Sequence, residues 1–246
     1  MKKKEAPSPA AVAGDGYMPG IAIDTVIFGF HEAQLKILLL EYRNTGLFAL
    51  PGGFVRRDED VNNEAKRVLA ERTGLQNIWL EQFYTFGDIA RFDPAPMKRI
   101  LKQNGIAVTK DHWLLKRFIS VGYYALVDFT KAVPAADVMS DVCDWYHLDN
   151  LPPLMQDHEK IVEKALSVLR LNLDRQLIGF NLLPQYFTIN ELQALYETVL
   201  GESLNRSSFQ RRMLSLGILQ RIEKKFSGGA HKAPYVYKFR EPSAKY

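Results

Sequence analysis

Cysteine is nearly absent from this sequence, and long apolar runs are missing. Cys143 is the single cysteine among 246 residues, which excludes an intramolecular disulfide and a four-cysteine zinc site. No apolar stretch approaches the roughly 20 residues that a membrane-spanning helix needs. Residues 1–19 start with basic residues but have no apolar core, which argues against a secretory signal. We therefore expect a cytoplasmic protein with no membrane partner, in which residues 1–19 form a flexible tail.

Metal and cofactor motifs are missing as well. The five histidines are scattered along the chain, at His31, His112, His147, His158 and His231. No His/Cys cluster therefore has the spacing of a zinc site. The sequence shows no Walker-type phosphate loop and no convincing Ser-His-Asp arrangement. We expect neither a bound metal nor a cofactor.

The composition is that of an ordinary globular protein, with 47% apolar and 24% charged residues. The net charge of +4 is unevenly distributed. Residues 177–246 contain 10 Lys and Arg against 5 Asp and Glu, whereas the remainder contains 22 against 23. A basic C-terminal part favours a polyanionic partner at that end, although a general solubility bias would produce the same charge.

Residues 51–75 (PGGFVRRDEDVNNEAKRVLAERTGL) resemble the signature of the Nudix family, G-x5-E-x7-R-E-U-x-E-E-x-G-U, in which U is a bulky aliphatic residue. The positions that match without a gap are Gly53, Glu59, Arg67, Leu69, Glu71, Gly74 and Leu75. Val68 and Arg72 depart from the signature, because each stands where the family has a glutamate.

These two departures remove two of the three metal-binding glutamates of a Nudix hydrolase. Such enzymes cleave diphosphates with divalent metal ions, usually Mg2+, which glutamates on adjacent turns of one helix hold. Only Glu71 of three remains, and Arg72 would place a positive charge where a cation should bind. Glu64, one turn before Val68, is a candidate substitute ligand. We expect no catalytic residue, and we interpret Arg72 as either an anchor for a phosphate or hydroxyl group or a solvated helix charge.

Residues 20–175 are predicted to form an α/β domain. Amphipathic helices on either side of a mixed sheet give the three-layer α/β/α sandwich of Nudix proteins. Residues 89–117 form an unusually long connection with a short helix at 97–103, which suits a lid, a ligand loop, an oligomer contact or a plain insertion. The expected strands are 21–30, 35–43, 78–88, 119–129 and 142–152, and the expected helices are 61–73 and 158–173.

A pocket without turnover suits ligand sensing, and ten positions near the signature are candidates to line it. They lie in the first strand, in the loop before the signature, after the following strand, in a returning strand, and at the start of the last helix. A purely structural role is the competing interpretation for each. The predicted effector-binding residues are Asp24, Arg43, Phe48, Glu71, Arg72, Asp88, Arg91, Tyr123, Asp157 and His158.

Residues 176–246 have the element order of a winged helix-turn-helix. Thr188 and Glu191 form a capping box that opens a helix closed by Gly201, and Asn205 is a suitable N-cap for the next helix. A β-hairpin with a basic tip follows. A solvated basic face on a protein-interaction module is the alternative interpretation.

A recognition helix at this place would enter the major groove with its N-terminal residues, and a basic wing would contact phosphate or the minor groove. Phe209, Met213, Leu214 and Leu216 are expected to face inward. The predicted DNA-contacting residues are Arg206, Ser207, Ser208, Gln210, Arg211 and Arg212 in the helix, and Lys224, Lys225, His231 and Lys232 in the wing.

A degenerate Nudix domain followed by a winged helix resembles the Nudix-related transcriptional regulator family. The segments DTVIFGF, LPGGFV, AKRVLAERTGL and IGFNLLPQYFTINELQALYE carry the resemblance. It implies a repressor that acts as a homodimer, in which the N-terminal domain binds a small effector and the C-terminal domain binds double-stranded operator DNA. Effectors in the family include ADP-ribose and L-arabinose, and the FGF and IGFNLLP segments are most similar to the arabinose branch. The rival hypotheses are a Nudix hydrolase of a nucleoside or sugar diphosphate and a protein-interaction module.

Overall fold

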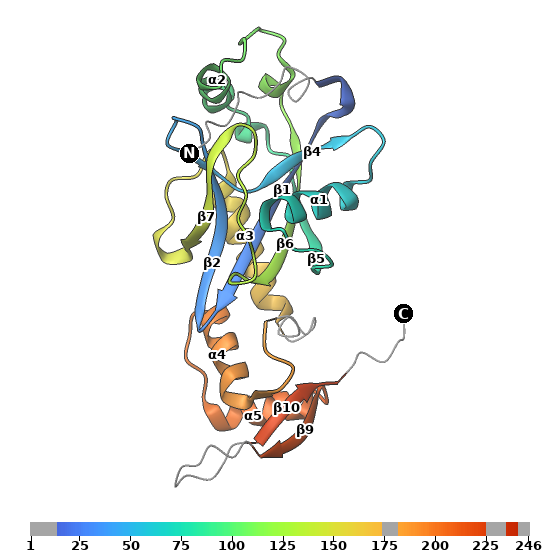
Figure 1. The fold of residues 1–246 in the computed structure, drawn as a ribbon, viewed down its shortest axis with the longest axis vertical. Helices are drawn as coiled ribbons and strands as arrows, with labels where there is room; N and C mark the ends of the chain where they lie inside the picture. The colour runs from blue at the N-terminus through green and yellow to red at the C-terminus, as the bar shows by residue number, and fades with distance from the viewer. Residues whose placement is uncertain (1–13, 174–181, 225–234, 241–246) are drawn as a thin grey trace. The chain divides into compact units, whose positions relative to one another are not determined.

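The computed structural model describes residues 14–173, 182–224 and 235–240. The chain divides into two compact units, Met1–Gly29 with Leu35–Val168, and Phe30–Gln34 with Leu169–Tyr246. Figure 1 shows the elements of both units. The predicted boundary between residues 175 and 176 lies outside the described residues, as do residues 1–13 of the predicted tail. Residues 17–19, expected in the flexible tail, belong instead to the first strand.

The first unit is built around a seven-stranded sheet in the order β3-β2-β1-β6-β5, with β4 paired to β1 and β7 paired to β2. Residues 23–29 of the long first strand are buried, as expected when helices cover both faces of a sheet. The strands are β1 (Tyr17–His31), β2 (Gln34–Tyr42), β3 (Leu47–Ala49), β4 (Gly52–Arg56), β5 (Leu80–Phe86), β6 (Ile119–Asp128) and β7 (Ser140–His147).

A two-residue turn joins β1 to β2. Both turn residues, Glu32 and Ala33, have positive φ angles, of 43° and 59°. Positive φ at both positions is the backbone of a type I′ turn, whose twist matches that of the flanking strands. The predicted hairpin is confirmed, and the turn forms here without the glycine that usually occupies such positions.

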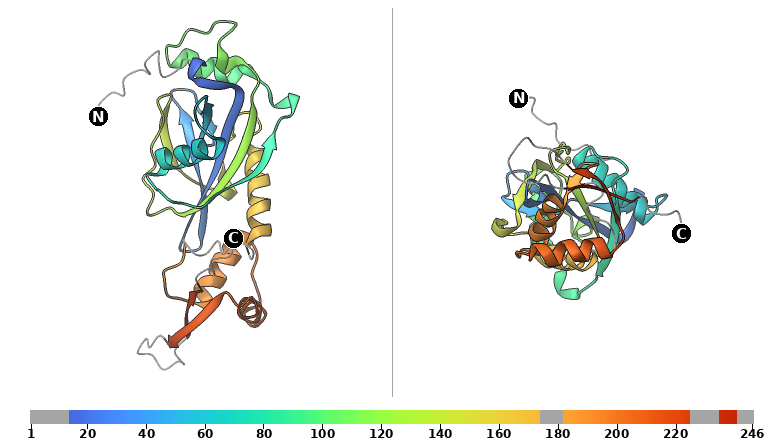
Figure 2. Two further views of the ribbon diagram at one scale, coloured as in Figure 1. Left: turned by 90° about the vertical axis from the view of Figure 1, so that its right-hand side faces the viewer. Right: turned by 90° about the horizontal axis from the view of Figure 1, so that it is seen from below.

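Helices α1 (Val61–Thr73) and α3 (His158–Asn172) lie on opposite sides of the sheet (Figure 2). Ala65 and Leu69 of α1 are buried at helical spacing against the sheet. The helix ends at Gly74, whose φ of 69° is the left-handed conformation that glycine adopts readily. The predicted α/β/α sandwich and the predicted span of α1 are confirmed. Among the helices of the described residues, none combines the length and apolar composition needed to cross a bilayer.

The long connection before β6 contains ordered elements of its own. Helix α2 (Pro94–Gln103) starts three residues earlier than predicted, because Asp93 caps it by accepting a hydrogen bond from the Ala95 amide at 2.9 Å. Pro94 then occupies the first turn, where its missing N–H costs nothing. Ile100 and Leu101 of this helix are fully buried. The 3-10 turns η3 (Ile89–Arg91) and η4 (Trp113–Leu115) flank it.

In its described residues, the second unit contains helices α4 and α5 and a three-stranded sheet. Thr188 and Glu191 form the predicted capping box, and Gly201 ends the first helix in the left-handed conformation. Asn205 caps the second helix by accepting a hydrogen bond from the Ser208 amide at 3.0 Å. The sheet order is β8-β10-β9. The elements are β8 (Phe187–Thr188), α4 (Ile189–Leu200), α5 (Arg206–Ser215), β9 (Leu219–Lys224) and β10 (Tyr235–Phe239).

The inward face of α5 is narrower than predicted. Phe209 and Met213 are buried, 3% and 0% exposed, whereas Leu214 and Leu216 are 44% and 41% exposed. The reason is geometric, since residues four apart share one face of a helix. Leu214 lies one step round from that face, and Leu216 follows the last helical residue. The prediction that these two leucines face inward is wrong.

Candidate effector site and DNA interface

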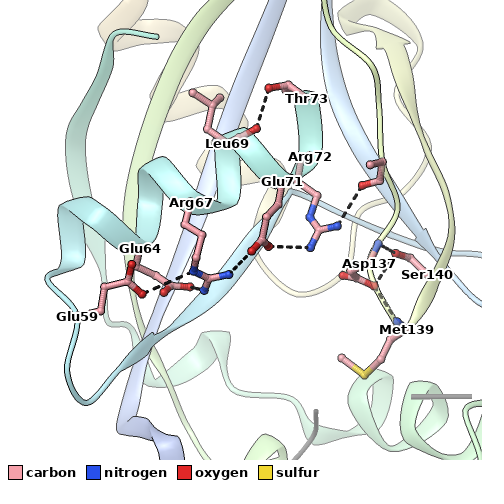
Figure 3. A network of polar contacts seen from close by, with 11 residues as sticks. Glu59, Glu64, Arg67, Leu69, Glu71, Arg72, Thr73, Asp137, Met139 and Ser140 are labelled. Atoms are coloured by element: carbon pink, nitrogen blue, oxygen red, sulfur yellow. Dashed lines mark hydrogen bonds and ion pairs between the residues drawn. The ribbon is translucent and has the colours of Figure 1, made fainter. Parts of the chain in front are cut away.

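Arg67 of α1 lies among three glutamates at the centre of the Nudix signature (Figure 3). Its Nη1 atom donates to Glu71 Oε1 at 2.7 Å, its Nη2 atom donates to Glu64 Oε1, and its Nε atom lies 3.6 Å from Glu59 Oε2. Glu59 comes from the loop before α1, and the other two glutamates lie one helical turn either side of Arg67. The cluster therefore fixes that loop to the helix.

Burial and charge pairing determine how this cluster titrates. Burial raises the pKa of the Glu64 carboxyl, whose side chain is 0% exposed, and the hydrogen bond from Arg67 opposes that rise. Burial by itself would lower the pKa of the Arg67 guanidinium, but the hydrogen bonds to Glu64 and Glu71 outweigh it and raise this pKa. The carboxylate of Glu64, the candidate substitute metal ligand, is thus already paired with Arg67.

Glu71, the one glutamate left in the signature, lies between two arginines. Its Oε1 atom accepts from Arg67, and its Oε2 atom lies 3.6 Å from Arg72 Nη2. Two guanidinium groups therefore compensate the carboxylate that a hydrolase would offer to a metal. Within residues 14–173, 182–224 and 235–240, no group of three or more His, Cys, Asp and Glu side chains has an arrangement that could hold a metal ion.

Arg72 connects the end of α1 to the loop before β7. Its Nη1 atom donates to the Ala135 carbonyl oxygen at 3.1 Å, and its own carbonyl accepts from the Ala135 amide at 3.0 Å. The side chain is only 11% exposed, so the interpretation as a solvated helix charge is wrong. Its Nη2 atom faces Glu71, and Arg72 also lines the larger of the two hollows described below. Its role as an anchor for a ligand stays a prediction.

Two hollows meet beside the glycine turn of the signature. The larger, about 690 Å³, is lined by α1 residues that include Arg67, Glu71 and Arg72. The smaller, about 130 Å³, lies among β1, η3, α2 and the start of α3. Both are lined by Gly52, Gly53 and neighbouring residues. A Cβ atom on Gly52 would lie 2.6 Å from the Ile23 carbonyl oxygen, so only glycine lets these backbones approach each other.

Asp24, Arg91 and His158, three predicted effector-binding residues from distant parts of the sequence, line the smaller hollow, and a fourth, Asp157, pairs with Arg91 beside it. Arg91 donates to Asp157 from Nε at 2.9 Å and from Nη2 at 3.1 Å. The same Nη2 atom lies 3.5 Å from Asp24 Oδ2, and His158 Nε2 lies 3.6 Å from Asp24 Oδ1. His158 Nδ1 accepts a hydrogen bond from the Leu50 amide at 3.0 Å, which leaves the Nε2 proton facing Asp24.

The other predicted residues lie elsewhere in the described part of the first unit. Arg43 pairs with Asp141 at 2.9 Å, and Phe48 packs edge-on against Tyr146. Tyr123 is 2% exposed and donates to Asn62 at 2.5 Å beneath α1. Asp88 is exposed before η3. The prediction of these four residues rests on their position in strands and neighbouring loops, and such a position does not tell which face or end of the sheet a side chain reaches.

Aromatic residues that the sequence analysis missed line the larger hollow. Tyr17 stacks on Trp113, with ring centroids 5.3 Å apart and planes inclined by 13°, and Phe54 meets Trp113 edge-on at 4.7 Å. All three residues line this hollow. Phe54 directly follows the PGG turn, so its place beside the site could have been predicted from the sequence. Trp113 comes from the long connection, whose path could not be inferred.

The second unit presents a basic helix to solvent. Most of the predicted contact residues of α5 are exposed: Arg206, Ser207, Ser208, Arg211 and Arg212, with Gln210 partly buried. Lys224 ends β9, and Lys225, His231 and Lys232 lie outside the described residues. Arg221 of β9 lies over the Tyr235 ring, 3.2 Å from its centroid. This contact was not predicted, because the register between two strands is not visible in the sequence.

Comparisons with known proteins agree with this architecture. Residues 179–239 match the model of the NrtR DNA-binding winged helix domain. A Nudix-fold domain followed by a DNA-binding winged helix defines a class of transcriptional regulators. The crystal structure of Shewanella oneidensis NrtR is similar at a TM-score of 0.67 and 26% identity, covering 90% of this chain and 94% of that chain. The same protein complexed with a 27mer DNA is similar at a TM-score of 0.65, covering 89% and 93%.

Two curated proteins are also similar. The "ADPR responsive transcriptional repressor NtrR" of Acinetobacter baylyi is 31% identical over 228 residues, which cover 90% of this chain and 82% of that protein. An ADP-ribose pyrophosphatase of Methanocaldococcus jannaschii is 28% identical over 148 residues, which cover 59% of this chain and 72% of that enzyme. The chain belongs to the Nudix-related transcriptional regulator family, and it is a DNA-binding regulator.

Proposed function

We propose that this protein is a homodimeric, cytoplasmic transcriptional repressor that releases its double-stranded operator DNA when ADP-ribose binds to the Nudix-fold domain. The observation that carries the proposal is a hollow beside a signature whose last glutamate, Glu71, is paired with Arg67 and Arg72. At about 690 Å³ the hollow has the size of a typical small-molecule site. Such a site suits binding without turnover.

ADP-ribose is a better candidate effector than L-arabinose. The Acinetobacter baylyi relative is described as ADP-ribose responsive and matches 90% of this chain. The larger hollow offers stacked aromatic side chains next to guanidinium groups, which suits a nucleobase and a diphosphate. A bare pentose would leave most of that hollow empty.

The effector must bind one arrangement of the repressor better than another in order to change DNA affinity. Helix α3 is the proposed transmitter. Its first residue, His158, lines the smaller hollow, and the helix continues to Asn172, past the division between the two units at Val168 and Leu169. A shift at its first turn is therefore passed along one continuous element to the start of the second unit.

A gel-shift titration on a palindromic operator tests this proposal. ADP-ribose is expected to weaken operator binding by about tenfold or more, within the range of typical allosteric coupling. L-arabinose at the same concentration is expected to have no effect. Calorimetry on the same protein measures ADP-ribose binding directly. An operator affinity that ADP-ribose leaves unchanged would contradict the sensor function.

A Nudix hydrolase with an accessory domain is the second candidate, and the likeness to an ADP-ribose pyrophosphatase favours it. That function requires a metal-binding carboxylate cluster. The pairing of Glu64 and Glu71 with Arg67 argues against it. Release of AMP from ADP-ribose in the presence of Mg2+ would support the enzyme.

A further inference from the structure

The C-terminal ends of α3 and α4 each receive a side chain from the other helix. The last carbonyl groups of a helix have no partner within that helix. Arg170, in the last turn of α3, donates from Nε to the Val199 carbonyl oxygen of α4 at 2.9 Å. In return, the Tyr196 hydroxyl of α4 donates to the Leu173 carbonyl oxygen, directly after α3, at 3.1 Å. These residues all belong to the second unit.

The two contacts differ in strength because they differ in burial. Tyr196 and Leu173 are each 4% exposed, and a buried carbonyl group that loses its partner is costly. Arg170 is exposed, although its positive charge is favourably placed at the C-terminus of α4. A Cβ atom on Gly201, which ends α4, would lie 3.3 Å from Arg170 Nη2. Both contacts fix the end of α3 to α4, and the Tyr196 hydroxyl does so most firmly.

Tyr196 also contacts the predicted recognition helix. Its ring meets Phe209 of α5 edge-on, with ring centroids 5.1 Å apart and planes inclined by 65°. Phe209 and Met213 are the buried residues of α5, so this ring contact lies at the face that attaches α5 to the second unit. One tyrosine therefore holds the end of α3 by its hydroxyl group and α5 by its ring.

The turn between α4 and α5 is fixed to α4. Glu197 Oε1 accepts from the Leu204 amide at 2.8 Å and from Gln193 Nε2 at 2.9 Å. Gln193 Nε2 also donates to the Leu204 carbonyl oxygen at 2.9 Å. Leu204 directly precedes Asn205, the N-cap of α5. We therefore expect α4 and α5 to move as one body, whose attachment to α3 decides where α5 lies.

We propose that Tyr196 is a positioning residue, through which the end of α3 sets the place of the recognition helix. We call the contacts of Arg170 with Val199 and of Tyr196 with Leu173 the α3–α4 joint. As a route for the effector signal, the joint rests on the proposed function and deepens it. Helix α3 starts at His158 beside the smaller hollow, and the joint is where a displacement of α3 passes to α4 and α5.

Two substitutions that each remove one hydroxyl group from α4 provide a matched pair. Tyr196→Phe removes the donor to Leu173 and keeps the ring that packs against Phe209. Thr198→Val removes a hydroxyl group that donates within α4, to the Ala194 carbonyl oxygen at 2.6 Å. A merely stabilising role for the Tyr196 hydroxyl would lower the free energy of unfolding and leave the response to effector unchanged. Operator binding without effector reports that each variant is folded.

Fluorescence anisotropy of operator DNA, with and without ADP-ribose, measures that response in the full-length protein. ADP-ribose is expected to weaken operator binding by about tenfold for the unchanged protein and for Thr198→Val, but by about twofold or less for Tyr196→Phe. Calorimetry without DNA should give ADP-ribose affinities within about threefold of one another, because distant and independent sites affect each other little. A Tyr196→Phe protein that keeps the full response, or that no longer binds ADP-ribose, would overturn the joint.

Hydrogen exchange tests the joint without any effector. Operator DNA should slow amide exchange in α5, and the joint should extend this protection to residues 169–172 of α3 in the unchanged protein and in Thr198→Val. In Tyr196→Phe the added protection should persist in α5 and disappear from α3. Equal protection of α3 in Tyr196→Phe and in the unchanged protein would overturn the joint. If the unchanged protein shows no response to ADP-ribose while hydrogen exchange follows the expected pattern, the proposed effector fails and the joint stands.

Discussion

Replacing Arg206 and Arg211 together with alanine is expected to lower operator affinity by about a hundredfold or more. Both side chains are exposed, Arg206 at the first and Arg211 at the sixth position of α5. The N-terminal part of a recognition helix reaches base edges. An arginine that contacts guanine with two hydrogen bonds contributes about 1–3 kcal/mol to discrimination. In a homodimer each substitution removes two such contacts. The double variant should therefore lose more operator affinity than a variant that lacks one exposed charge.

A control variant and a scrambled duplex separate this explanation from a general loss of positive charge. Arg57→Ala, a change in the first unit, removes the same charge per substitution and serves as the control. It is expected to change operator affinity less than threefold, because Arg57 belongs to the first unit and not to the winged helix. Fluorescence anisotropy on operator and scrambled duplexes measures both variants. Operator affinity of the Arg206 and Arg211 double variant within threefold of the unchanged protein would show that α5 is not the recognition helix.

Removing Arg67 is expected to destabilise the first unit by about 3 kcal/mol at neutral pH. Arg67 is the cation for the fully buried Glu64 and also binds Glu71. Breaking a buried ion pair by removing one partner costs about 3–5 kcal/mol, and the 25% exposure of the Arg67 side chain places the effect at the lower end. Urea denaturation of Arg67→Ala measures this loss. Lys66→Ala, an exposed neighbour on the same helix, should change stability by less than about 0.5 kcal/mol.

The loss should also depend on pH, with a sign that follows from Glu64. Burial raises the pKa of this carboxyl, and without Arg67 nothing opposes the rise. A group whose pKa is raised on folding favours the folded state where it is protonated. The stability deficit of Arg67→Ala should therefore shrink as the pH falls from 8 towards 5 and grow as the pH rises through the raised pKa. A deficit that stays constant over this interval would mean that Glu64 is not the group left unpaired.

The regular elements could be predicted because their signals are local. Helix α1 is bounded by an apolar repeat and by Gly74, and α4 by the Thr188 capping box, so nearby residues define both. The hairpin between β1 and β2 follows from two apolar runs with a short break. Strand β8 was missed because its two residues, Phe187 and Thr188, form a strand only by pairing with β10.

The site was harder to predict because its residues meet through the tertiary fold. Arg91 and Asp157 are 66 positions apart and pair only because η3 lies beside the start of α3. Position near strand and helix ends suggested both residues, but equally suggested Arg43 and Tyr123, which lie elsewhere. The glutamate missing at Val68 is visible in the sequence. The pairing of Glu64 with Arg67 is not visible in the sequence, since it depends on which side chains of α1 are buried.

The measurement that tests the central claim most directly follows ADP-ribose and operator DNA in one sample. Repressor bound to its operator is incubated with ADP-ribose and Mg2+, free DNA is measured by anisotropy, and the nucleotide is then analysed by chromatography. A sensor in which arginines pair with the one remaining signature glutamate should release the DNA, and the ADP-ribose should be recovered unchanged. AMP and ribose 5-phosphate appearing over many turnovers, or DNA that stays bound at saturating ADP-ribose, would contradict it.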